Sequence, residues 1–313
     1  MPGFVDVQIN GYAGVDFNSD GLRPEELHRC CQALIRDGVE GILATVITDD
    51  VAVMSRRIAR IAELRELDPL ARQLIWGFHI EGPFISPKPG FVGAHPSQHA
   101  QNATRDAMQK LLDAGAGLVR LVTLAPEMDP RQQVTRMLSD AGIIVSGGHS
   151  DASLDQLDAA IDVGLMMFTH LGNGCPMNMN RHDNIVQRVL SFADRLWISF
   201  IADGAHIPFF ALQNYLKLVG LERAIVVTDA ISAAGCGPGR FPLGNRFVNV
   251  GEDGVPRAED HSHLVGSGTI MSKMADNLKV ELGLMPAEIE LLTESNPQQL
   301  LATFSGVATG SLA

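Results

Sequence analysis

The sequence predicts a closed (β/α)8 barrel, an α/β fold, in a single domain that spans residues 1–313. Three observations support this fold: eight short apolar segments have the pattern of strands, helical patterns separate most of them, and several strands are near-continuous runs of Val, Ile and Leu. Such runs are typical of parallel strands that are buried on both faces. Strands that alternate with helices form right-handed βαβ units. An open doubly wound sheet is the weaker alternative, because no GxGxxG motif follows the first strand.

The expected strands are short apolar segments, and they are Val5–Ile9, Gly41–Ile47, Ile75–Glu81, Leu118–Leu124, Ile143–Gly148, Leu165–Thr169, Trp197–Ala202 and Ala224–Thr228. The expected helices have helical apolar spacing, and they are Pro24–Arg36, Val51–Leu67, Thr104–Ala114, Pro130–Ala141, Ser153–Val163 and Phe209–Val219. In the second helix, Arg and Glu side chains are expected on the outer face. Residues 235–254 have the weakest pattern, and we expect a long loop there.

Composition restricts the class of protein. The chain has 313 residues, 46% of them hydrophobic, which is enough for one large core. A net charge of -12 and a pI near 5.2 argue against nucleic acid as a partner. No apolar run approaches the roughly 20 residues that a membrane span needs. Cys30, Cys31, Cys175 and Cys236 form no CxxC motif, and no leader begins at Met1, so we expect a cytoplasmic protein without disulfides.

Polar and ionisable residues lie at the carboxyl ends of the expected strands, where the active site of a (β/α)8 barrel is built. These residues are Gln8, Asn10, Glu81, His149, His170, Asp203, His206 and Asp229. Glu81 is the clearest example, because it ends an apolar strand at a position where an unpaired charge is costly to bury. A metal ion or a substrate would neutralise that charge.

Glu81, His149 and His170 together form a carboxylate and two imidazoles, a common ligand set for a catalytic zinc. A bound divalent metal would lower the pKa of a water to roughly 7 and polarise a carbonyl. Each of the three residues alone would more simply be a strand cap or a backbone partner. Their joint occurrence favours a metal site.

Each of the other candidate site residues has a possible chemical role and a simpler structural explanation. Asp229, in VVTDA, could move a proton from the attacking water to the leaving group, or it could cap the following turn. His95, in GAH, could polarise a carbonyl or hold a hydroxyl, although loop histidines are usually solvated. Arg181 and His206 could together bind an anion, since Arg offers a bidentate fork, although an isolated Arg is usually solvated.

Two further loop motifs are weaker. The turn at Asn173-Gly174 could present backbone N–H groups to an anion, or it could be only a tight turn. His261 and His263 flank Ser262 as an HxH pair, but no apolar strand precedes them. We therefore expect both histidines to be solvated.

Several segments resemble, in this order, the N-acetylglucosamine-6-phosphate deacetylases of the amidohydrolase superfamily. They are PGFVDVQINGYAGVDFN, HIEGPF, GAH, GGHSDA, THLGNG, ADGAH, VVTDAISAAG and LVGSGTIM. The resemblance extends from Gly3 to about Ala308. It implies a metal-dependent amidohydrolase barrel that removes the acetyl group from N-acetylglucosamine 6-phosphate, in amino-sugar catabolism.

The resemblance also implies roles for particular residues. Glu81, His149 and His170 match the metal ligands, and Asp229 matches the catalytic acid and base. The matches to substrate contacts are Ala94, His95, Asn173, Gly174, Arg181, His206, Leu264, Val265 and Gly266, with Arg181 and His206 near the sugar phosphate.

The chain departs from the family pattern in three places. Gln8 and Asn10 stand where many amidohydrolases carry HxH, so we expect one metal per chain, most simply zinc, because amides are weak zinc ligands. Asn173-Gly174-Cys175 stands where the family usually reads NAM, which leaves N-acetylgalactosamine 6-phosphate as an alternative substrate. Family members usually also carry a small β-sandwich; we expect it to be absent, and a homodimer partner to cover the exposed barrel surface.

Two other functional hypotheses stay open at this point. The first is a metal-dependent deacetylase or cyclic amidase that acts on another N-acyl compound and is indifferent to phosphate. The second is a non-catalytic regulator that binds a sugar phosphate. The intact set of Glu81, His149, His170 and Asp229 argues against the regulator.

Overall fold

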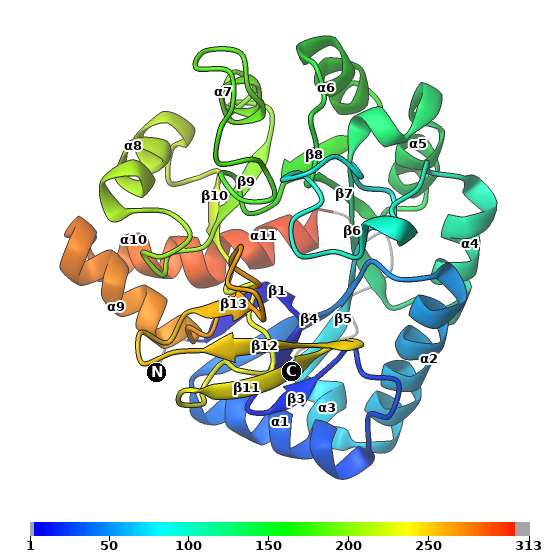
Figure 1. The fold of residues 1–313 in the computed structure, drawn as a ribbon, viewed down its shortest axis with the longest axis vertical. Coiled ribbons are helices and arrows are strands. Elements are labelled where there is room, and N and C mark those ends of the chain that lie inside the picture. The colour runs from blue at the N-terminus through cyan, green and yellow to red at the C-terminus, as the bar shows by residue number, and fades with distance from the viewer. Residues whose placement is uncertain (1–2, 304–313) are drawn as a thin grey trace.

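The computed structural model describes residues 3–303. Eight parallel strands form a nearly closed barrel, and the larger helices surround it (Figure 1). Each strand pairs with the next barrel strand along the chain. The strands are β1 (Phe4–Ile9), β4 (Val39–Ile47), β5 (Ile75–Glu81), β6 (Val119–Leu124), β7 (Ile144–Gly147), β8 (Leu165–Phe168), β9 (Trp197–Phe200) and β10 (Ala224–Val226). The predicted parallel (β/α)8 barrel and all eight predicted strands are confirmed.

The first and last strands meet just beyond their carboxyl ends, where two backbone hydrogen bonds bring the barrel close to closure. The N–H of Asp229 donates to the carbonyl of Gln8 at 3.0 Å, and the N–H of Asn10 donates to the carbonyl of Ala230 at 2.7 Å. This contact places the side chains of Gln8 and Asn10 beside Asp229.

The helices begin at residues that either lack a free backbone N–H group or accept a hydrogen bond from one. Pro24 starts α1, and the Asp50 carboxylate accepts a hydrogen bond of 2.9 Å from the N–H of Ala52 at the start of α2. The α-helices are α1 (Pro24–Arg36), α2 (Val51–Leu67), α3 (Pro69–Leu74), α4 (Arg105–Ala114), α5 (Gln133–Asp140), α6 (Leu154–Ile161), α7 (Ile185–Leu190), α8 (Phe209–Val219), α9 (Met271–Leu282), α10 (Pro286–Glu290) and α11 (Asn296–Ala302). The short helical turns are η1 (Ser97–His99), η2 (Pro126–Met128), η3 (Pro130–Gln132) and the π-helical η4 (Leu291–Ser295).

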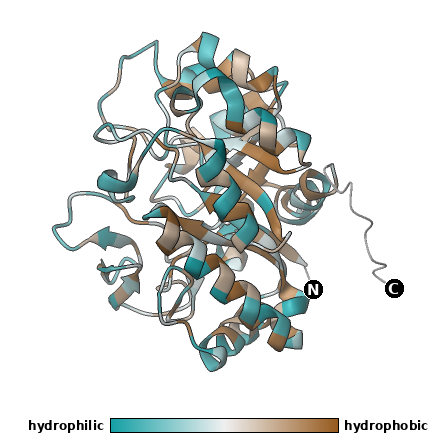
Figure 2. Ribbon diagram, turned by 90° about the vertical axis from the view of Figure 1, so that its right-hand side faces the viewer, coloured by the Kyte–Doolittle hydropathy of each residue, from teal (hydrophilic) through white to brown (hydrophobic). Residues whose placement is uncertain are grey.

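The core lies inside the barrel and between the barrel and its helices. All six residues of β1 and all four of β7 are buried, as expected for strands that are covered on both faces. Figure 2 shows hydrophobic residues along the strands and hydrophilic residues on the outer faces of the helices. The barrel is therefore a rigid support for side chains at its carboxyl-end rim.

Residues 235–254 are not a continuous loop, so that prediction was wrong. They form β11 (Gly239–Leu243) and β12 (Arg246–Val250), and β13 (Pro256–Ala258) completes an antiparallel sheet at the barrel mouth (Figure 1). A two-residue turn joins β11 to β12, with Gly244 at a φ of 58°. The sheet is held because Leu243 and Val248 pack in one apolar cluster with Ile231. A smaller hairpin pairs β2 (Gly11–Tyr12) with β3 (Val15–Asp16).

The prediction for α2 also needs one correction. Its Arg side chains were expected on the outer face, but Arg57 is only 3% exposed. Its guanidinium forms ion pairs with Asp20 at 2.7 Å and with Asp49 at 2.9 Å. These two carboxylates allow a charged side chain to be buried under the barrel mouth.

Two other predictions concern the extent of the chain. Within residues 3–303, none of the helices has both the length and the apolar character that crossing a membrane requires. The β-sandwich was expected to resume, if present, near residue 306, which lies outside the described residues. Its absence stays a prediction.

Candidate active site

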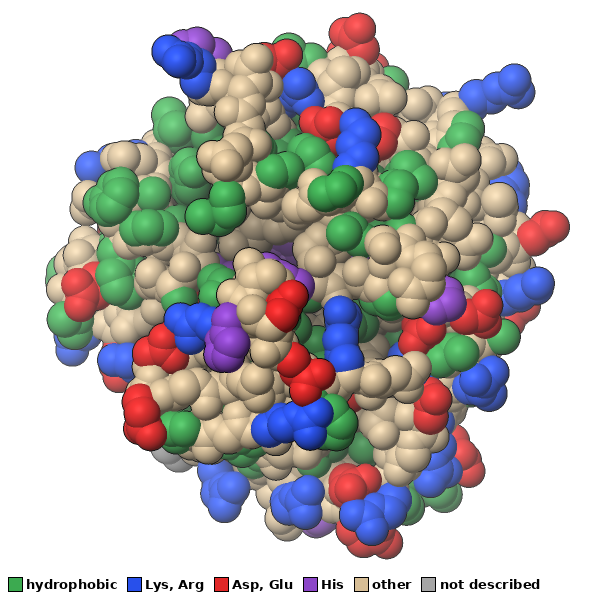
Figure 3. Space-filling view, viewed as in Figure 1, with side chains coloured by type: hydrophobic (Ala, Val, Ile, Leu, Met, Phe, Trp, Pro, Cys, Tyr) green, Lys and Arg blue, Asp and Glu red, His purple; other side chains and the backbone are tan. Residues whose placement is uncertain are grey.

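A cavity of about 740 Å3, here called the main cavity, opens at the carboxyl ends of the barrel strands. Figure 3 shows it as a hollow near the middle of one face, with histidine side chains at its floor. Glu81, the last residue of β5, lies in this floor and is 2% exposed. Strands far apart in sequence place their terminal side chains around this one cavity, at the end of the barrel where the site was predicted.

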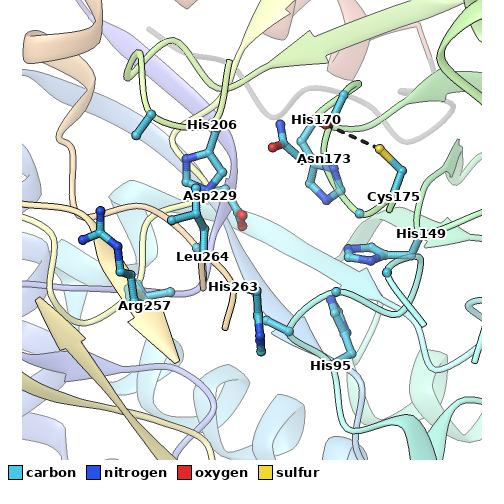
Figure 4. Close-up of a pocket in the computed structure, with 18 of the residues that line it drawn as sticks. His95, His149, His170, Asn173, Cys175, His206, Asp229, Arg257, His263 and Leu264 are labelled. Atoms are coloured by element: carbon cyan, nitrogen blue, oxygen red, sulfur yellow. Dashed lines mark hydrogen bonds between the residues drawn. The ribbon is translucent and has the colours of Figure 1, made fainter. Parts of the chain in front are cut away.

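Glu81 is surrounded by histidines. His170 Nε2 lies 2.9 Å and His149 Nε2 lies 3.3 Å from the same oxygen, Glu81 Oε1. His95 approaches from the loop after β5, and its Nε2 lies 3.9 Å from Glu81 Oε2. Figure 4 shows these three histidines along one side of the cavity. The predicted set of Glu81, His149 and His170 is therefore brought together, and His95 joins it.

The hydrogen bonds of His149 determine which nitrogen carries its proton. Its Nδ1 lies 2.9 Å from the carbonyl oxygen of Phe91, which can only accept, so Nδ1 carries a hydrogen. In the neutral ring, Nε2 then points a lone pair at the Glu81 carboxylate, which also only accepts. A cation between them removes this conflict, and a second partner on Nδ1 is typical of metal-binding histidines. The residues present therefore fit a metal ion.

His95 has a comparable arrangement. Its Nδ1 lies 2.8 Å from Thr48 Oγ1, and that hydroxyl donates its own hydrogen to the backbone carbonyl of Glu81 at 3.2 Å. Nδ1 of His95 is therefore the donor, and its Nε2 is an acceptor that faces the cavity. Nitrogen and oxygen atoms of Glu81, His95 and His149 all lie within 4.8 Å of one another. His95 thus has the geometry of an alternative third ligand, beside the predicted His170.

The charges of this cluster depend on one another. Burial alone would raise the pKa of Glu81, but the close approach of His149 and His170 to its carboxylate holds that pKa well below its usual value. Burial would lower the pKa of His170, yet the hydrogen bond to Glu81 and the charges of Glu81 and Asp229 raise it. Burial lowers the pKa of His95 well below its usual value, and His149 adds to this effect. The ring of His95 is therefore neutral, which suits either a metal ligand or a hydrogen-bond acceptor.

Asp229 follows β10 and is partly exposed to the main cavity. Its Oδ1 accepts hydrogen bonds from Asn10 Nδ2 at 2.7 Å and from Gln8 Nε2 at 3.3 Å. Gln8 Nε2 also donates to Glu81 Oε1 at 3.0 Å. Burial, followed by the charge of Glu81, raises the pKa of Asp229 to about 6. Gln8 and Asn10 thus donate their amide hydrogens to the two carboxylates.

The other side of the main cavity holds His206, Leu264 and Arg257 (Figure 4). His206 Nδ1 lies 2.7 Å from Asp203 Oδ2, so Nδ1 carries a hydrogen and the carboxylate fixes the orientation of the ring. Hydrogen bonds from His206 and the charge of that ring lower the pKa of Asp203 despite its burial.

Most of the predicted substrate contacts line the main cavity, and these are Ala94, His95, Asn173, Gly174, His206, Leu264 and Gly266. Two predicted contacts lie elsewhere. Val265 is 2% exposed and packs in the apolar cluster with Ile231. Arg181 is exposed and is not among the residues that line the cavity. Arg181 therefore does not meet His206 within the described chain.

Several lining residues were not predicted. Ile47 ends a predicted strand, so the rule that located Glu81 could have found it. Leu243 and Arg257 come from the sheet β11–β13, for which no strand was expected. His261 and His263 are exposed, as predicted, but they lie on the edge of the cavity.

Comparisons with known proteins agree with this geometry, although no protein-family model matches the chain. N-acetylglucosamine-6-phosphate deacetylase from Bos taurus is 35% identical over 283 residues, which cover 88% of this chain and 66% of that protein. N-acetylgalactosamine-6-phosphate deacetylase from Shewanella sp. (strain ANA-3) is 33% identical over 285 residues, which cover 91% of this chain and 69% of that protein.

A solved structure extends the likeness to three dimensions. It is a mutant N-acetyl-D-glucosamine-6-phosphate deacetylase from Mycobacterium smegmatis in complex with N-acetyl-D-glucosamine-6-phosphate. The match has a TM-score of 0.87 and 28% sequence identity, and the aligned part covers 96% of this chain and 77% of that chain. Together with the barrel and the main cavity, these similarities show that the chain belongs to the N-acetylglucosamine-6-phosphate deacetylase family.

Proposed function

We propose that this protein is a hydrolase that removes the acetyl group from N-acetylglucosamine 6-phosphate and releases glucosamine 6-phosphate and acetate. The observation that supports this most is the placement of the Asp229 carboxylate in one cavity with Glu81, His149 and His170. Family membership adds the substrate class, since relatives are named for either the gluco or the galacto sugar phosphate.

The same cluster supports one divalent metal ion per chain, and we propose zinc. Glu81, His149 and His170 would hold it, because both imidazole Nε2 atoms converge on Glu81 Oε1. His95 is the alternative third ligand. When bound, such a metal supplies an activated water and polarises the acyl carbonyl.

Asp229 is the proposed proton carrier. It takes a proton from the water that attacks the acetamide carbonyl carbon, and it gives that proton to the amine nitrogen as the C–N bond breaks. Its pKa, raised to about 6, is still below neutral pH, so Asp229 is mostly ionised there and yet basic enough to hold a proton briefly. The hydrogen bonds from Gln8 and Asn10 fix its orientation.

His95 fits one of its two expected roles better than the other. Its contact with Thr48 leaves Nε2 without a hydrogen, so His95 cannot polarise a carbonyl by donating to it. The same nitrogen can accept a hydrogen bond from a sugar hydroxyl. If His170 is the third metal ligand, His95 therefore orients the sugar.

His206 is the proposed phosphate contact on the opposite side of the cavity. Asp203 holds its Nδ1, so its Nε2 is free to meet an anion, and a protonated ring would be balanced by that carboxylate. Arg181 is exposed and does not line this cavity. Its predicted contact with the phosphate stays a prediction.

A homodimer also remains part of the proposal. Large hydrophobic side chains are exposed on neighbouring helices: Phe210 is 75% exposed, Leu218 is 65% exposed, and Val280 is 75% exposed. Figure 3 shows hydrophobic side chains gathered over α8 on the same face as the main cavity. Light scattering after size-exclusion chromatography would give the mass: twice the chain mass is expected, and a monomer at all concentrations would reject the dimer.

Acetate release from a panel of substrates tests the proposed function. The panel is N-acetylglucosamine 6-phosphate, N-acetylglucosamine and N-acetylgalactosamine 6-phosphate, each with protein of measured zinc content. We expect the first to have the highest kcat/KM. A preference for the galacto sugar phosphate would select the second candidate, which the Shewanella relative supports. Equal rates with and without phosphate would reject the phosphate contact.

A further inference from the structure

His149 has a backbone conformation that residues other than glycine rarely adopt. It is the second residue after β7, and its φ of 50° lies in the left-handed region. Such a conformation persists only where surrounding contacts hold the backbone, and it is common at functional sites. The ring of this residue points at Glu81, with Nε2 at 3.3 Å from Oε1. The contacts that hold the backbone of His149 therefore decide whether its ring meets Glu81.

Two of these contacts come from the loop that follows β5. The ring Nδ1 of His149 donates to the carbonyl of Phe91 at 2.9 Å, and the N–H of Ser86 donates to the carbonyl of His149 at 2.9 Å. They fix the ring and the carbonyl group of the same residue. Neither contact involves the residues that follow His149 in the chain, so these residues need a separate support.

Glu127 provides that support from the neighbouring strand. It lies in η2, just after β6, and it is half-buried. Ser150 Oγ donates to Glu127 Oε2 at 2.6 Å, and the N–H of Asp151 donates to Glu127 Oε1 at 2.6 Å. Short hydrogen bonds to a carboxylate are stronger than those between neutral groups. The carboxylate thus holds, with one oxygen each, the two residues that follow His149.

The two donors require a side chain that accepts twice. The hydroxyl oxygen of Ser150 accepts a hydrogen bond of 3.0 Å from the N–H of Ala152, and its own hydrogen points at Glu127. The N–H of Asp151 can only donate. A carboxylate accepts from both donors at once, whereas an amide offers a single acceptor oxygen. The residue type at position 127 therefore fits this double contact.

Glu127 is not placed to act on a substrate itself. It is not among the residues that line the main cavity, and Ser150 and Asp151 occupy its two oxygens. The mechanism described above does not use it. Any effect of Glu127 on the reaction must therefore act through the segment that begins at His149.

We propose that Glu127 is a positioning residue for His149. Its carboxylate holds Ser150 and the N–H of Asp151, and it thereby keeps the backbone of His149 in the conformation in which Nε2 meets Glu81. Zinc binds more tightly to a histidine that is held in place than to one that must first be ordered. The effect on zinc rests on the proposed function, whereas the hold on the ring does not.

The test compares the wild type, Glu127→Ala, Glu127→Gln and Asp129→Asn. Asp129 is the matched control, because it is a buried carboxylate in the same segment whose partners, Val134 and Thr135, belong to α5. Competition with a chelator gives the dissociation constant of zinc. In metal-free protein with isotope-labelled histidine, NMR detects the Nδ1–H of His149, which is assigned by its loss in His149→Ala.

We expect Glu127→Ala to weaken zinc binding roughly tenfold or more, and its His149 Nδ1–H signal to broaden or vanish as the ring becomes mobile. Glu127→Gln keeps one acceptor oxygen, so its values should lie between those of Glu127→Ala and the wild type. Asp129→Asn should keep the zinc affinity and the signal, even where it lowers the melting temperature. If Glu127→Ala does not fold, Ser150→Ala takes its place, because it removes one of the two hydrogen bonds.

Wild-type zinc affinity in Glu127→Ala would overturn the proposal. Equal losses in Glu127→Ala and Asp129→Asn would overturn it as well, because they would show only a general loosening of the segment after β6. If the wild type binds no zinc, the proposed function fails, and the NMR signal alone decides the inference. A His149 signal that is lost in Glu127→Ala and kept in Asp129→Asn supports it, and a signal that is kept in both rejects it.

Discussion

The side-chain amide of Asn10 donates a hydrogen bond of 2.7 Å to the carboxylate of Asp229. The two residues are 219 positions apart in the chain, and they meet because β1 and β10 come together where the barrel closes. Burial and the charge of Glu81 raise the pKa of Asp229 to about 6, whereas the Asn10 amide opposes this rise. Asn10 is therefore a positioning residue that also helps to keep Asp229 ionised.

Removing this amide should disturb proton transfer. In Asn10→Ala, the pKa of Asp229 rises further, so the acid limb of the pH profile of kcat moves to higher pH. We expect kcat at neutral pH to fall by roughly tenfold, as for a lost hydrogen bond to a charged group, with little change in KM. Asn102→Ala, at an exposed position, is the control. An unmoved acid limb would show that Asn10 does not act on Asp229.

The identity of the third metal ligand can be settled by metal analysis. If His170 is that ligand, His170→Ala should weaken zinc binding by more than roughly tenfold, while His95→Ala keeps about one zinc per chain. The measurement is zinc per chain by mass spectrometry after dialysis against a weak chelator. His28→Ala, on the outer side of α1, is the control. Loss of zinc in His95→Ala but not in His170→Ala would assign the ligand to His95.

Asp6 should make stability depend on pH. Burial raises the pKa of this carboxyl from 3.8 to about 7, although hydrogen bonds from Thr228 and the N–H of Gln8 oppose the shift. Between these values the folded chain binds more protons than the unfolded chain. The resulting stabilisation is present below about pH 4 and is lost as the pH rises through about 7, by at most about 4 kcal/mol.

Urea unfolding of the wild type and of Asp6→Asn over this pH range measures the effect. We expect the free energy of unfolding of the wild type to fall more steeply with rising pH than that of Asp6→Asn, which cannot ionise at this position. Parallel curves for the two proteins would mean that Asp6 has the same pKa in the folded and unfolded chains.

Arg57 should contribute strongly to stability because it compensates Asp49, which is 8% exposed. Arg57→Met leaves that carboxylate without its nearest cation and should lower the free energy of unfolding by about 3 kcal/mol. Arg56→Met, the neighbouring residue on the exposed side of α2, should change it by less than about 0.5 kcal/mol. Chemical denaturation gives both values, and equal effects of the two substitutions would reject the role of Arg57.

Local patterns predicted the barrel well. Three helices were predicted with the observed bounds: Pro24–Arg36, Val51–Leu67 and Phe209–Val219. In each of them the apolar spacing and the residues at the start indicate the same helix. The site at the carboxyl ends of the strands followed from the geometry of parallel barrels, which places Glu81, His149, His170 and Asp229 around one opening without any knowledge of their contacts.

The sheet β11–β13 escaped prediction because its strands are short and carry Arg and Asn, so apolar alternation is weak. The Gly244-Asn245 pair between FPL and RFVNV is a hairpin signal that could have located its first turn. The position of this sheet could not be predicted, because only the folded chain brings Leu243 and Arg246 over the barrel mouth beside Arg57. Likewise, the tautomer of His95 depends on Thr48, a contact between distant segments that no local pattern contains.

The most direct test of the central proposal is acetate release from N-acetylglucosamine 6-phosphate by the zinc-loaded wild type and by Asp229→Asn. We predict turnover by the wild type and a loss of roughly a thousandfold in kcat for the variant, with zinc content and melting temperature unchanged. Acetate release by Asp229→Asn at near wild-type rates, or none by the wild type, would contradict the proposed reaction.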